Sequence, residues 1–345
     1  MTELSSIMGS KQATWLVTGA AGFIGSNLCI ALLKAGQTVR GFDNYSTGHR
    51  HNIADIKLVD SALAKSQFTM IEADICDLEA CKAALQDVDY VLHQAALGSV
   101  PRSIATPLVS HQANVTGFVT LLHASAQARV KKFVYASSSS VYGDSAELPK
   151  VELRTGALLS PYAATKSINE TYASVFQRNY GIECVGLRYF NVFGPRQDPN
   201  GPYAAVIPKW ISGLLQNAVI KINGDGSTSR DFCYIGNVIQ ANVRAALTPS
   251  LDQNSKVFNI AFGDRTTLSH LLDGLKTSLA EALSIPVSEL TSRIEHAAFR
   301  DGDVLHSLAN TDAARDVIGY VPTHSLSQGL AITTPWYVAN QDRLK

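Results

Sequence analysis

The sequence predicts an α/β fold, with a doubly wound parallel sheet followed by a smaller C-terminal α/β domain. The first observation is that short β-branched runs alternate with longer helical patterns from residue 14 to about residue 188. This order and spacing are typical of parallel strands covered by helices on both faces. The second is that Gly-Pro and Asp-Pro turns separate short apolar segments after Asn191. We therefore expect one domain over residues 1–190 and another over 191–345, with a segment near 235–262 that returns to the first domain.

The expected elements follow each other in a regular order along the first domain. The predicted strands, which are rich in β-branched and aromatic residues, cover residues 14–18, 38–42, 68–72, 89–93, 133–137 and 184–188. Helical patterns run from the first glycine turn to residue 35 and over 78–85, 116–129 and 162–180. Residues 257–261 are expected to add a late strand to the same sheet. In such a sheet the carboxyl ends of the strands line the ligand crevice.

Composition excludes several classes of protein. Hydrophobic residues make up 46% of the 345 residues and charged residues 17%, which is typical of a globular chain. The 29 basic and 29 acidic residues cancel, so nothing favours a nucleic-acid or membrane-surface partner. Residues 1–13 lack the layout of a signal peptide, and no apolar run approaches the roughly 20 residues that span a bilayer. We expect a soluble, cytoplasmic protein.

Cysteine and histidine spacing gives no metal signature. The five cysteines are odd in number and form no CxxC pair, so reduced thiols are expected. Among the nine histidines, His49 and His51 are close in sequence, but they lie in a polar stretch and are expected to be solvated. No metal site is predicted.

A dinucleotide site is predicted at the carboxyl edge of the sheet. Gly19, Gly22 and Gly25 follow the first strand in a GxxGxxG pattern, and such glycines let a backbone approach a pyrophosphate at the N-terminus of the next helix. Asp43 closes the second strand, where a carboxylate accepts hydrogen bonds from the adenosine ribose and repels a 2′-phosphate. NAD is therefore favoured over NADP. The third and fourth strands end at the same edge in Asp74-Ile75 and Gln94-Ala95-Ala96.

A catalytic centre is predicted on the helix over residues 162–180. Tyr162 and Lys166 lie four residues apart and therefore on one face of that helix. The pKa of a free tyrosine is about 10, and a nearby ammonium together with a positive nicotinamide favours its phenolate form. This spacing is common on helix surfaces, and a serine run is often only a polar turn. Here residues 137–140 place serines at the end of the fifth strand, beside the same crevice, so a hydroxyl can orient a substrate alcohol.

Together these motifs resemble the extended short-chain dehydrogenase/reductase family, which has a Rossmann-type fold. The resemblance extends over nearly the whole chain from Thr14 and also includes His93, the Val141-Tyr142-Gly143 segment and residues 188–195. Within the family, residues 98–103, 203–210 and 229–234 most closely resemble bacterial UDP-N-acetylhexosamine 4-epimerases, which interconvert UDP-GlcNAc and UDP-GalNAc.

The resemblance implies a redox-neutral epimerisation at the sugar C4 through a transient 4-keto sugar. Tyr162 would remove the O4 proton, Lys166 would hold the nicotinamide ribose, and Ser138 would bond to O4. It implies further NAD contacts at Phe23, Ile24, Asn44, Ser46, Thr47, Gly48 and Tyr189. It implies UDP-sugar contacts at Ser99, Arg102, Ser139, Asn191, Ala205, Val206, Lys209, Asn223, Arg230, Arg300 and Asp303, of which Arg230 and Arg300 suit the diphosphate. Relatives commonly dimerise through two helices, here over 107–129 and 162–180.

Several alternatives are compared with this interpretation. A 4,6-dehydratase needs a Thr-Asp-Glu sequence where this chain has Ser138-Ser139-Ser140. A UDP-glucose/UDP-galactose 4-epimerase uses the same catalytic residues, so the size of the pocket decides whether an N-acetyl group fits. An acetylated sugar is favoured by small residues near the expected sugar position, namely Gly98, Ser99, Ser139 and Ala205. A catalytically silent NAD-binding regulatory protein would not need the intact catalytic trio. One departure from close relatives is Leu305 and Asn310 in place of Arg and Asp, which affects a local hydrogen-bond network.

Overall fold

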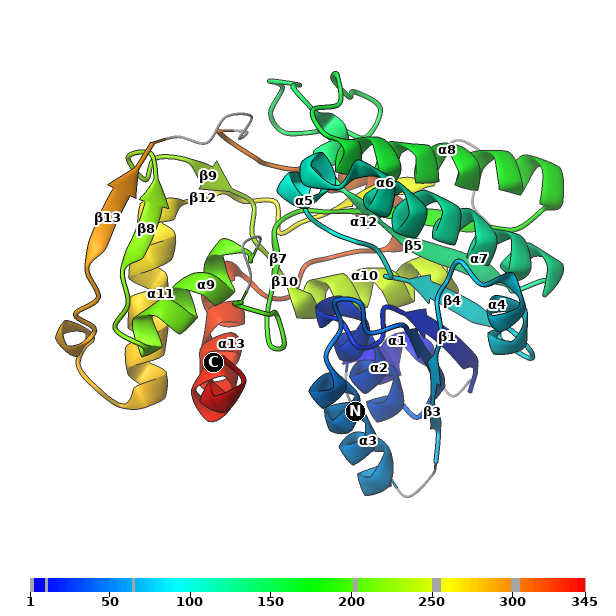
Figure 1. The fold of residues 1–345 in the computed structure, drawn as a ribbon, viewed down its shortest axis with the longest axis horizontal. Helices are drawn as coiled ribbons and strands as arrows, with labels where there is room; N and C mark the ends of the chain where they lie inside the picture. Colours follow the sequence, from blue (N-terminus) through cyan, green and yellow to red (C-terminus); the bar gives the residue numbers. More distant parts are fainter. Residues whose placement is uncertain are drawn as a thin grey trace.

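The computed structural model describes residues 3–9, 12–63, 66–200, 204–249, 256–298 and 305–344. Its centre is a seven-stranded sheet in the order β11-β6-β5-β4-β1-β2-β3 (Figure 1). Every neighbouring pair in this sheet is parallel. The predicted α/β fold with a doubly wound parallel sheet is therefore confirmed.

The strands of this sheet agree with the sequence-based bounds to within one residue at each end. They are β1 (Thr14–Thr18), β2 (Thr38–Asp43), β3 (Phe68–Glu72), β4 (Tyr90–His93), β5 (Lys132–Ser138), β6 (Cys184–Tyr189) and β11 (Val257–Ile260). Every residue of β6 is buried, as expected for a parallel strand covered on both faces.

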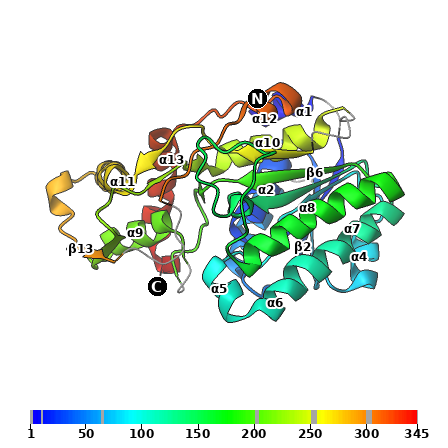
Figure 2. The same ribbon diagram turned by 90° about the horizontal axis from the view of Figure 1, so that it is seen from above.

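Helices cover both faces of the sheet. One face carries α2 (Phe23–Lys34), α3 (Arg50–Leu63) and α10 (Ile235–Leu247), and the other carries α4 (Leu78–Ala84), α7 (Gly117–Gln127) and α8 (Pro161–Tyr180). Figure 2 shows α4, α7 and α8 side by side. The side chains of β1 alternate between the two layers, with Trp15 and Val17 in one apolar core and Leu16 in the other.

Shorter elements complete this part of the molecule. They are α1 (Glu3–Met8), α5 (Val100–Ala105), α6 (Pro107–His111), the π-helix η1 (Gln112–Thr116), the 3₁₀-helix η2 (Ser139–Tyr142) and α12 (Asp312–Ile318). The predicted helix over 116–129 is thus preceded by a helical stretch that begins at Pro107.

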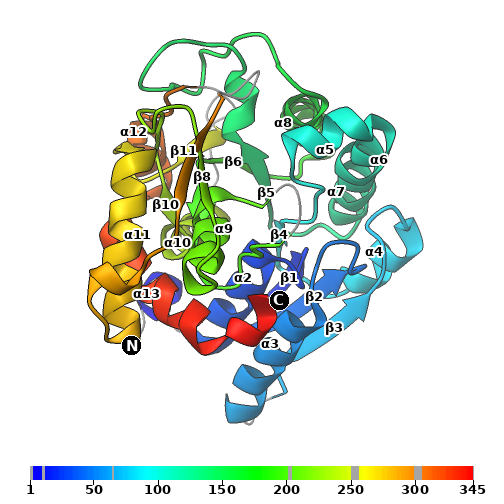
Figure 3. The ribbon, with the colours of Figure 1, turned by 60° about the vertical axis from the view of Figure 1, so that its left-hand side comes forward.

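A smaller layer, visible in Figures 1 and 3, is built around α9 (Val206–Leu215), α11 (Leu268–Leu283) and α13 (Leu326–Ala339). Three short strand pairs join it: β8 (Ile220–Asn223) with β13 (Ile294–Ala297), β9 (Ser229–Arg230) with β12 (Thr266–Thr267), and β7 (Val192–Phe193) with β10 (Cys233–Tyr234). The 3₁₀-helices η3 (Val287–Glu289) and η4 (Gln341–Leu344) complete it.

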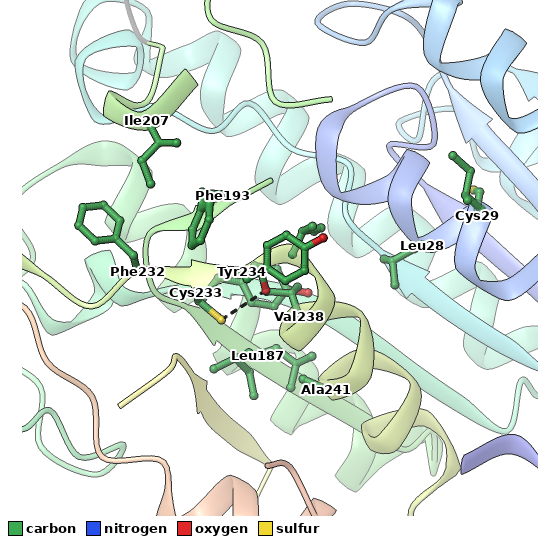
Figure 4. Packing of buried hydrophobic residues seen from close by; sticks show 14 of the residues in the cluster. Leu28, Cys29, Leu187, Phe193, Ile207, Phe232, Cys233, Tyr234, Val238 and Ala241 are labelled. Carbon is green, nitrogen blue, oxygen red and sulfur yellow. Dashed lines mark hydrogen bonds between the residues drawn. The ribbon is translucent and has the colours of Figure 1, made fainter. Parts of the chain in front are cut away.

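One apolar core joins the smaller layer to the sheet. Leu187 of β6 and Val238 of α10 belong to the same cluster as Phe193, Ile207 and Phe232 (Figure 4). Burial of each such side chain contributes roughly 1.5–3 kcal/mol. The two parts are therefore packed against each other rather than joined by a free linker. Among the described helices, none is long and apolar enough to cross a membrane.

Candidate active site

A cavity of about 990 Å³ opens at the carboxyl edge of the large sheet. This volume lies at the upper end of the range for small-molecule and cofactor sites. Of the residues predicted to hold NAD, all except Tyr162, Lys166 and Tyr189 line it, namely Gly19, Gly22, Phe23, Ile24, Gly25, Asp43, Asn44, Ser46, Thr47, Gly48, Asp74, Ile75, Gln94, Ala95 and Ala96. The hydroxyl of Tyr189 instead bonds to Gln94 and Asn242.

The glycine turn after β1 leaves its backbone open to this cavity. Gly19 has a φ of +68°, and a Cβ on Gly25 would lie 2.1 Å from the carbonyl oxygen of Gly19. The twelve-residue helix α2 has Gly22 at its N-cap, with no side chain capping it. A helix N-terminus of this kind offers N–H groups and a positive dipole end to an anion, which fits a pyrophosphate.

Asp43, the residue predicted to bind the adenosine ribose, ends β2 and lines the cavity. Its Oδ2 accepts a hydrogen bond of 2.9 Å from the backbone N–H of Ala21, and its Oδ1 accepts one of 2.7 Å from that of Tyr45. Burial raises the pKa of the Asp43 carboxyl, and these two N–H groups lower it in part. The Asp43 carboxylate is thus bound to the backbone of the glycine turn. The N–H groups of the turn and the oxygens of the carboxylate together fit NAD.

The loop over residues 194–200 closes one side of the cavity, which Arg196 and Asp198 line. His49 Nε2 lies 3.0 Å from Asp198 Oδ2 and donates to it, because an ionised carboxylate only accepts. Asp55 of α3 binds both Arg196 (3.2 Å) and Arg343 of η4 (2.9 Å). The sequence analysis expected His49 to be solvated, but its ring is bonded to Asp198. It also stacks on His51, with ring centroids 4.9 Å apart.

The predicted catalytic residues meet where β5 ends and α8 begins. Ser160 caps α8 by accepting a hydrogen bond from Ala163 N, and Pro161 occupies the first turn. The Ser138 hydroxyl lies close enough to that of Tyr162 to lower the pKa of Tyr162, and Ser138 Oγ also donates to Ser140 Oγ at 3.1 Å. Lys166 Nζ lies 5.9 Å from the centroid of the Tyr162 ring. The structure therefore brings the three side chains together.

Burial shifts the pKa values of Tyr162 and Lys166. It raises the pKa of Tyr162 above the usual value, and the hydrogen bond from Ser138 lowers it in part. Burial also lowers the pKa of Lys166 to about 8. The sequence-based expectation was that Lys166 depresses the tyrosine pKa, but in the chain itself Ser138 is the group that does so.

Sequence reasoning missed the groups that hold α8 in place. Ser103 Oγ accepts a hydrogen bond of 3.0 Å from the backbone N–H of Tyr162. Asn114 of the π-helix η1 donates to Thr165 Oγ1 (3.2 Å), and its Oδ1 accepts from the backbone N–H of Leu97, which lines the cavity. A π-helical turn often marks a functional site, but nothing in the local sequence signals it.

The structure places the residues predicted to contact a UDP-sugar on several different elements. Arg102 and Ala205 line it, while Ser99 caps α5 and Ser139 opens η2. Asn191 donates to the carbonyl of Asp231, and Arg230 donates to the carbonyl of Leu305. Val206 begins α9, Asn223 ends β8, and Lys209 is exposed on α9. Arg300 and Asp303 lie outside the described residues.

The departure at Leu305 and Asn310 has a local structural account. Asn310 Oδ1 accepts a hydrogen bond of 2.9 Å from the backbone N–H of Asp312, and its Nδ2 donates to the Asp312 carboxylate. An asparagine therefore closes the turn into α12 as an aspartate would. The Leu305 side chain is exposed, and its carbonyl accepts a hydrogen bond from the backbone N–H of Ser229.

Comparison with known proteins assigns the fold and site to a family. Residues 15–261 match the model of the NAD dependent epimerase/dehydratase family. The chain belongs to this family. The match confirms the resemblance to extended short-chain dehydrogenases/reductases, and it confirms NAD as the cofactor.

Relatives of this epimerase/dehydratase chain cover nearly all of its length. It is 35% identical to the UDP-glucose 4-epimerase of Mycolicibacterium smegmatis over 93% of this chain and 97% of the relative. It is similar to the solved UDP-N-acetylglucosamine 4-epimerase from Methanobrevibacter ruminantium M1, with 36% identity, 95% and 99% coverage and a TM-score of 0.84. The UDP-glucuronic acid 4-epimerase from Bacillus cereus, solved with UDP-glucuronic acid and NAD, has 31% identity, 94% and 99% coverage and a TM-score of 0.81.

Proposed function

We propose that this protein interconverts UDP-GlcNAc and UDP-GalNAc by epimerisation at C4. Family membership and the three relatives, each named as a UDP-sugar 4-epimerase, support NAD-dependent sugar-nucleotide 4-epimerase activity. The observation that carries the proposal is the meeting of Ser138, Tyr162 and Lys166 at the junction of β5 and α8. Thr165 bonds to the Tyr162 carbonyl, and Asn114 links Thr165 to Leu97, which lines the cavity.

Each member of this trio has a role that its surroundings support. The Tyr162 phenolate removes the proton from O4 and later returns it, so the phenolate is restored in every turnover. Ser138 holds the sugar O4 against Tyr162, and Lys166 supplies positive charge that favours the phenolate. NAD, when bound, supplies the hydride acceptor and donor. Because the proton and the hydride are both returned, the reaction needs no second substrate.

We assign the remaining UDP-sugar contacts from the positions that the family resemblance implies. We propose that residues 1–190 with the segment near 235–262 hold NAD, and that the rest of 191–345 holds the UDP group. Arg230 ends β9, and we assign its guanidinium to the diphosphate because arginine grips phosphate oxygens at two points. Arg102 of α5 lines the cavity.

Small side chains support an acetylated substrate over plain UDP-glucose. Gly98 and Ala205 line the cavity, and a Cβ added at Gly98 would meet no atom within 4 Å. We therefore expect kcat/KM for UDP-GlcNAc to exceed that for UDP-Glc by about tenfold, which is about 1.4 kcal/mol. The measurement is a side-by-side comparison of both sugars and UDP-glucuronic acid by anion-exchange chromatography.

A substitution at Gly98 tests the expected preference for UDP-GlcNAc over UDP-Glc. Gly98→Val fills the space beside the cavity, so we expect about a tenfold loss of kcat/KM for UDP-GlcNAc and a smaller loss for UDP-Glc. Equal losses for both sugars, or a preference of the unchanged protein for UDP-Glc, would favour the UDP-glucose 4-epimerase alternative.

We propose further that the protein is a homodimer joined through α6 and α8. These helices pack against each other and present exposed apolar side chains, including Leu108, Val109, Tyr172, Val175 and Tyr180. We expect light scattering to give the mass of two chains. Val175→Glu should shift that mass towards one chain, whereas Leu58→Glu, at an exposed leucine of α3, should not. A monomeric unsubstituted protein would refute the dimer.

A further inference from the structure

Three consecutive residues at the end of β5 are bound to one face of α8. The carbonyl of Ala136 accepts a hydrogen bond of 2.8 Å from Lys166 Nζ. Ser137 Oγ donates to Glu170 Oε1 at 2.5 Å, and the next residue, Ser138, bonds to Tyr162. Residues 162, 166 and 170 are four apart and share a face of the helix. Glu170 thus extends the catalytic face by one turn.

The carboxylate of Glu170 is buried in a bidentate ion pair. Its Oε1 accepts from Arg188 Nε at 2.9 Å and its Oε2 from Arg188 Nη2 at 2.8 Å. The two side chains are only 13% and 7% exposed. Arg188 of β6 is the direct cross-strand neighbour of Ser137 and also donates to the carbonyl of Glu152. Such charge-assisted pairs fix geometry as well as charge.

We propose that Glu170 is a positioning residue for the reaction: through Ser137 and Arg188 its carboxylate holds the catalytic face of α8 on the end of β5, and it places negative charge one helical turn from Lys166. The inference rests on the proposed function, which gives Tyr162 and Lys166 their roles. In the proposed mechanism a positive Lys166 favours the Tyr162 phenolate in addition to the effect of Ser138, and a neutral Lys166 would not.

The charges around Lys166 make Glu170 decisive. Lys166 is 2% exposed, and burial favours the neutral amine, while the Glu170 carboxylate opposes that effect. The ionisable groups of the neighbouring elements are His93 on β4, Tyr135 on β5, Arg188 on β6, Tyr142 in η2 and Tyr162 on α8 itself. None of these five carries negative charge near neutral pH, and burial keeps His93 neutral by lowering its pKa to about 3. The negative charge that reaches Lys166 within the described chain is therefore that of Glu170.

The first test is the pH dependence of kcat/KM for epimerisation in Glu170→Gln. Without the carboxylate, burial and the positive charge of the unpaired Arg188 both favour the neutral amine, so the pKa of Lys166 falls and the alkaline limb of the profile moves to lower pH by about one unit. The matched control is Glu183→Gln, which neutralises a carboxylate paired with Lys132 at the opposite end of the sheet and should leave the limb in place. Activity in the unsubstituted protein with an unmoved limb in Glu170→Gln overturns the inference; no epimerisation by the unsubstituted protein instead refutes the proposed function.

The second test needs no turnover. Protein labelled with ¹³C at lysine Cε is titrated by NMR without substrate, and the Lys166 signal is identified by its loss in Lys166→Arg. We expect the signal to titrate at lower pH in Glu170→Gln than in the unsubstituted protein. Because that variant leaves Arg188 buried without its partner, Glu170→Gln/Arg188→Met removes both charges and should titrate in the same lowered range. Identical titration of Lys166 in all three proteins overturns the inference.

Discussion

Replacement of Tyr162 by phenylalanine is expected to reduce kcat for epimerisation by about a thousandfold while NAD remains bound. The substitution removes the hydroxyl that Ser138 contacts and that we assign as the base, and general acid–base catalysis contributes about 10²–10⁴-fold. The cavity lining is unchanged, because Tyr162 is not part of it. The measurement is UDP-GalNAc formation from UDP-GlcNAc, with NAD content determined after denaturation.

The matched control for this variant is Tyr172→Phe on the same helix. Tyr172 is partly exposed and lies ten residues further along α8, away from the end of β5, so its hydroxyl should not matter for turnover. If Tyr162→Phe retains activity within about tenfold of the unsubstituted protein, Tyr162 is not the base. Loss of NAD together with activity would instead mean that the phenol supports the cofactor site.

The sheet and the catalytic trio were predictable because each depends on a local pattern. Buried parallel strands are continuous β-branched and aromatic runs, which is why the bounds of β1 were predicted without error. The carboxyl ends of neighbouring parallel strands must lie at one edge. Ser138 at the end of β5 and Tyr162 at the start of α8 were therefore expected at the same edge of the sheet as the glycine turn.

What the sequence did not reveal depends on contacts between distant segments. The pair of His49 and Asp198 joins two loops that are 149 residues apart, and no periodic pattern relates them. Asn114 lies in a π-helical turn, and the sequence of this turn has no pattern that distinguishes it from an ordinary α-helix. The pKa of Tyr162 was expected to fall beside Lys166, but the degree of burial, which raises it, is a property of the packed site.

Alanine at Gly25 is expected to weaken NAD binding by at least about a hundredfold and to lower the melting temperature by several degrees. The new Cβ would lie 2.1 Å from the carbonyl oxygen and 2.6 Å from the carbonyl carbon of Gly19. Both are backbone atoms, and that oxygen also accepts the hydrogen bond from Gly22 N that closes the turn. The turn must therefore open and displace the N-terminus of α2, where the pyrophosphate would bind. Overpacking of this kind costs roughly 1–3 kcal/mol.

Gly274→Ala provides the control, since it adds the same methyl group to a helical glycine of α11. Its Cβ would meet Leu330 Cδ1 at 3.6 Å, an ordinary contact, and alanine favours a helix over glycine by about 1 kcal/mol. We expect that variant to bind NAD normally and to melt at the same or a higher temperature. NAD affinity is measured by fluorescence titration and stability by calorimetry. If Gly25→Ala binds NAD as tightly as Gly274→Ala, the pyrophosphate does not lie on this turn, and the position of the cofactor relative to Tyr162 must be assigned anew.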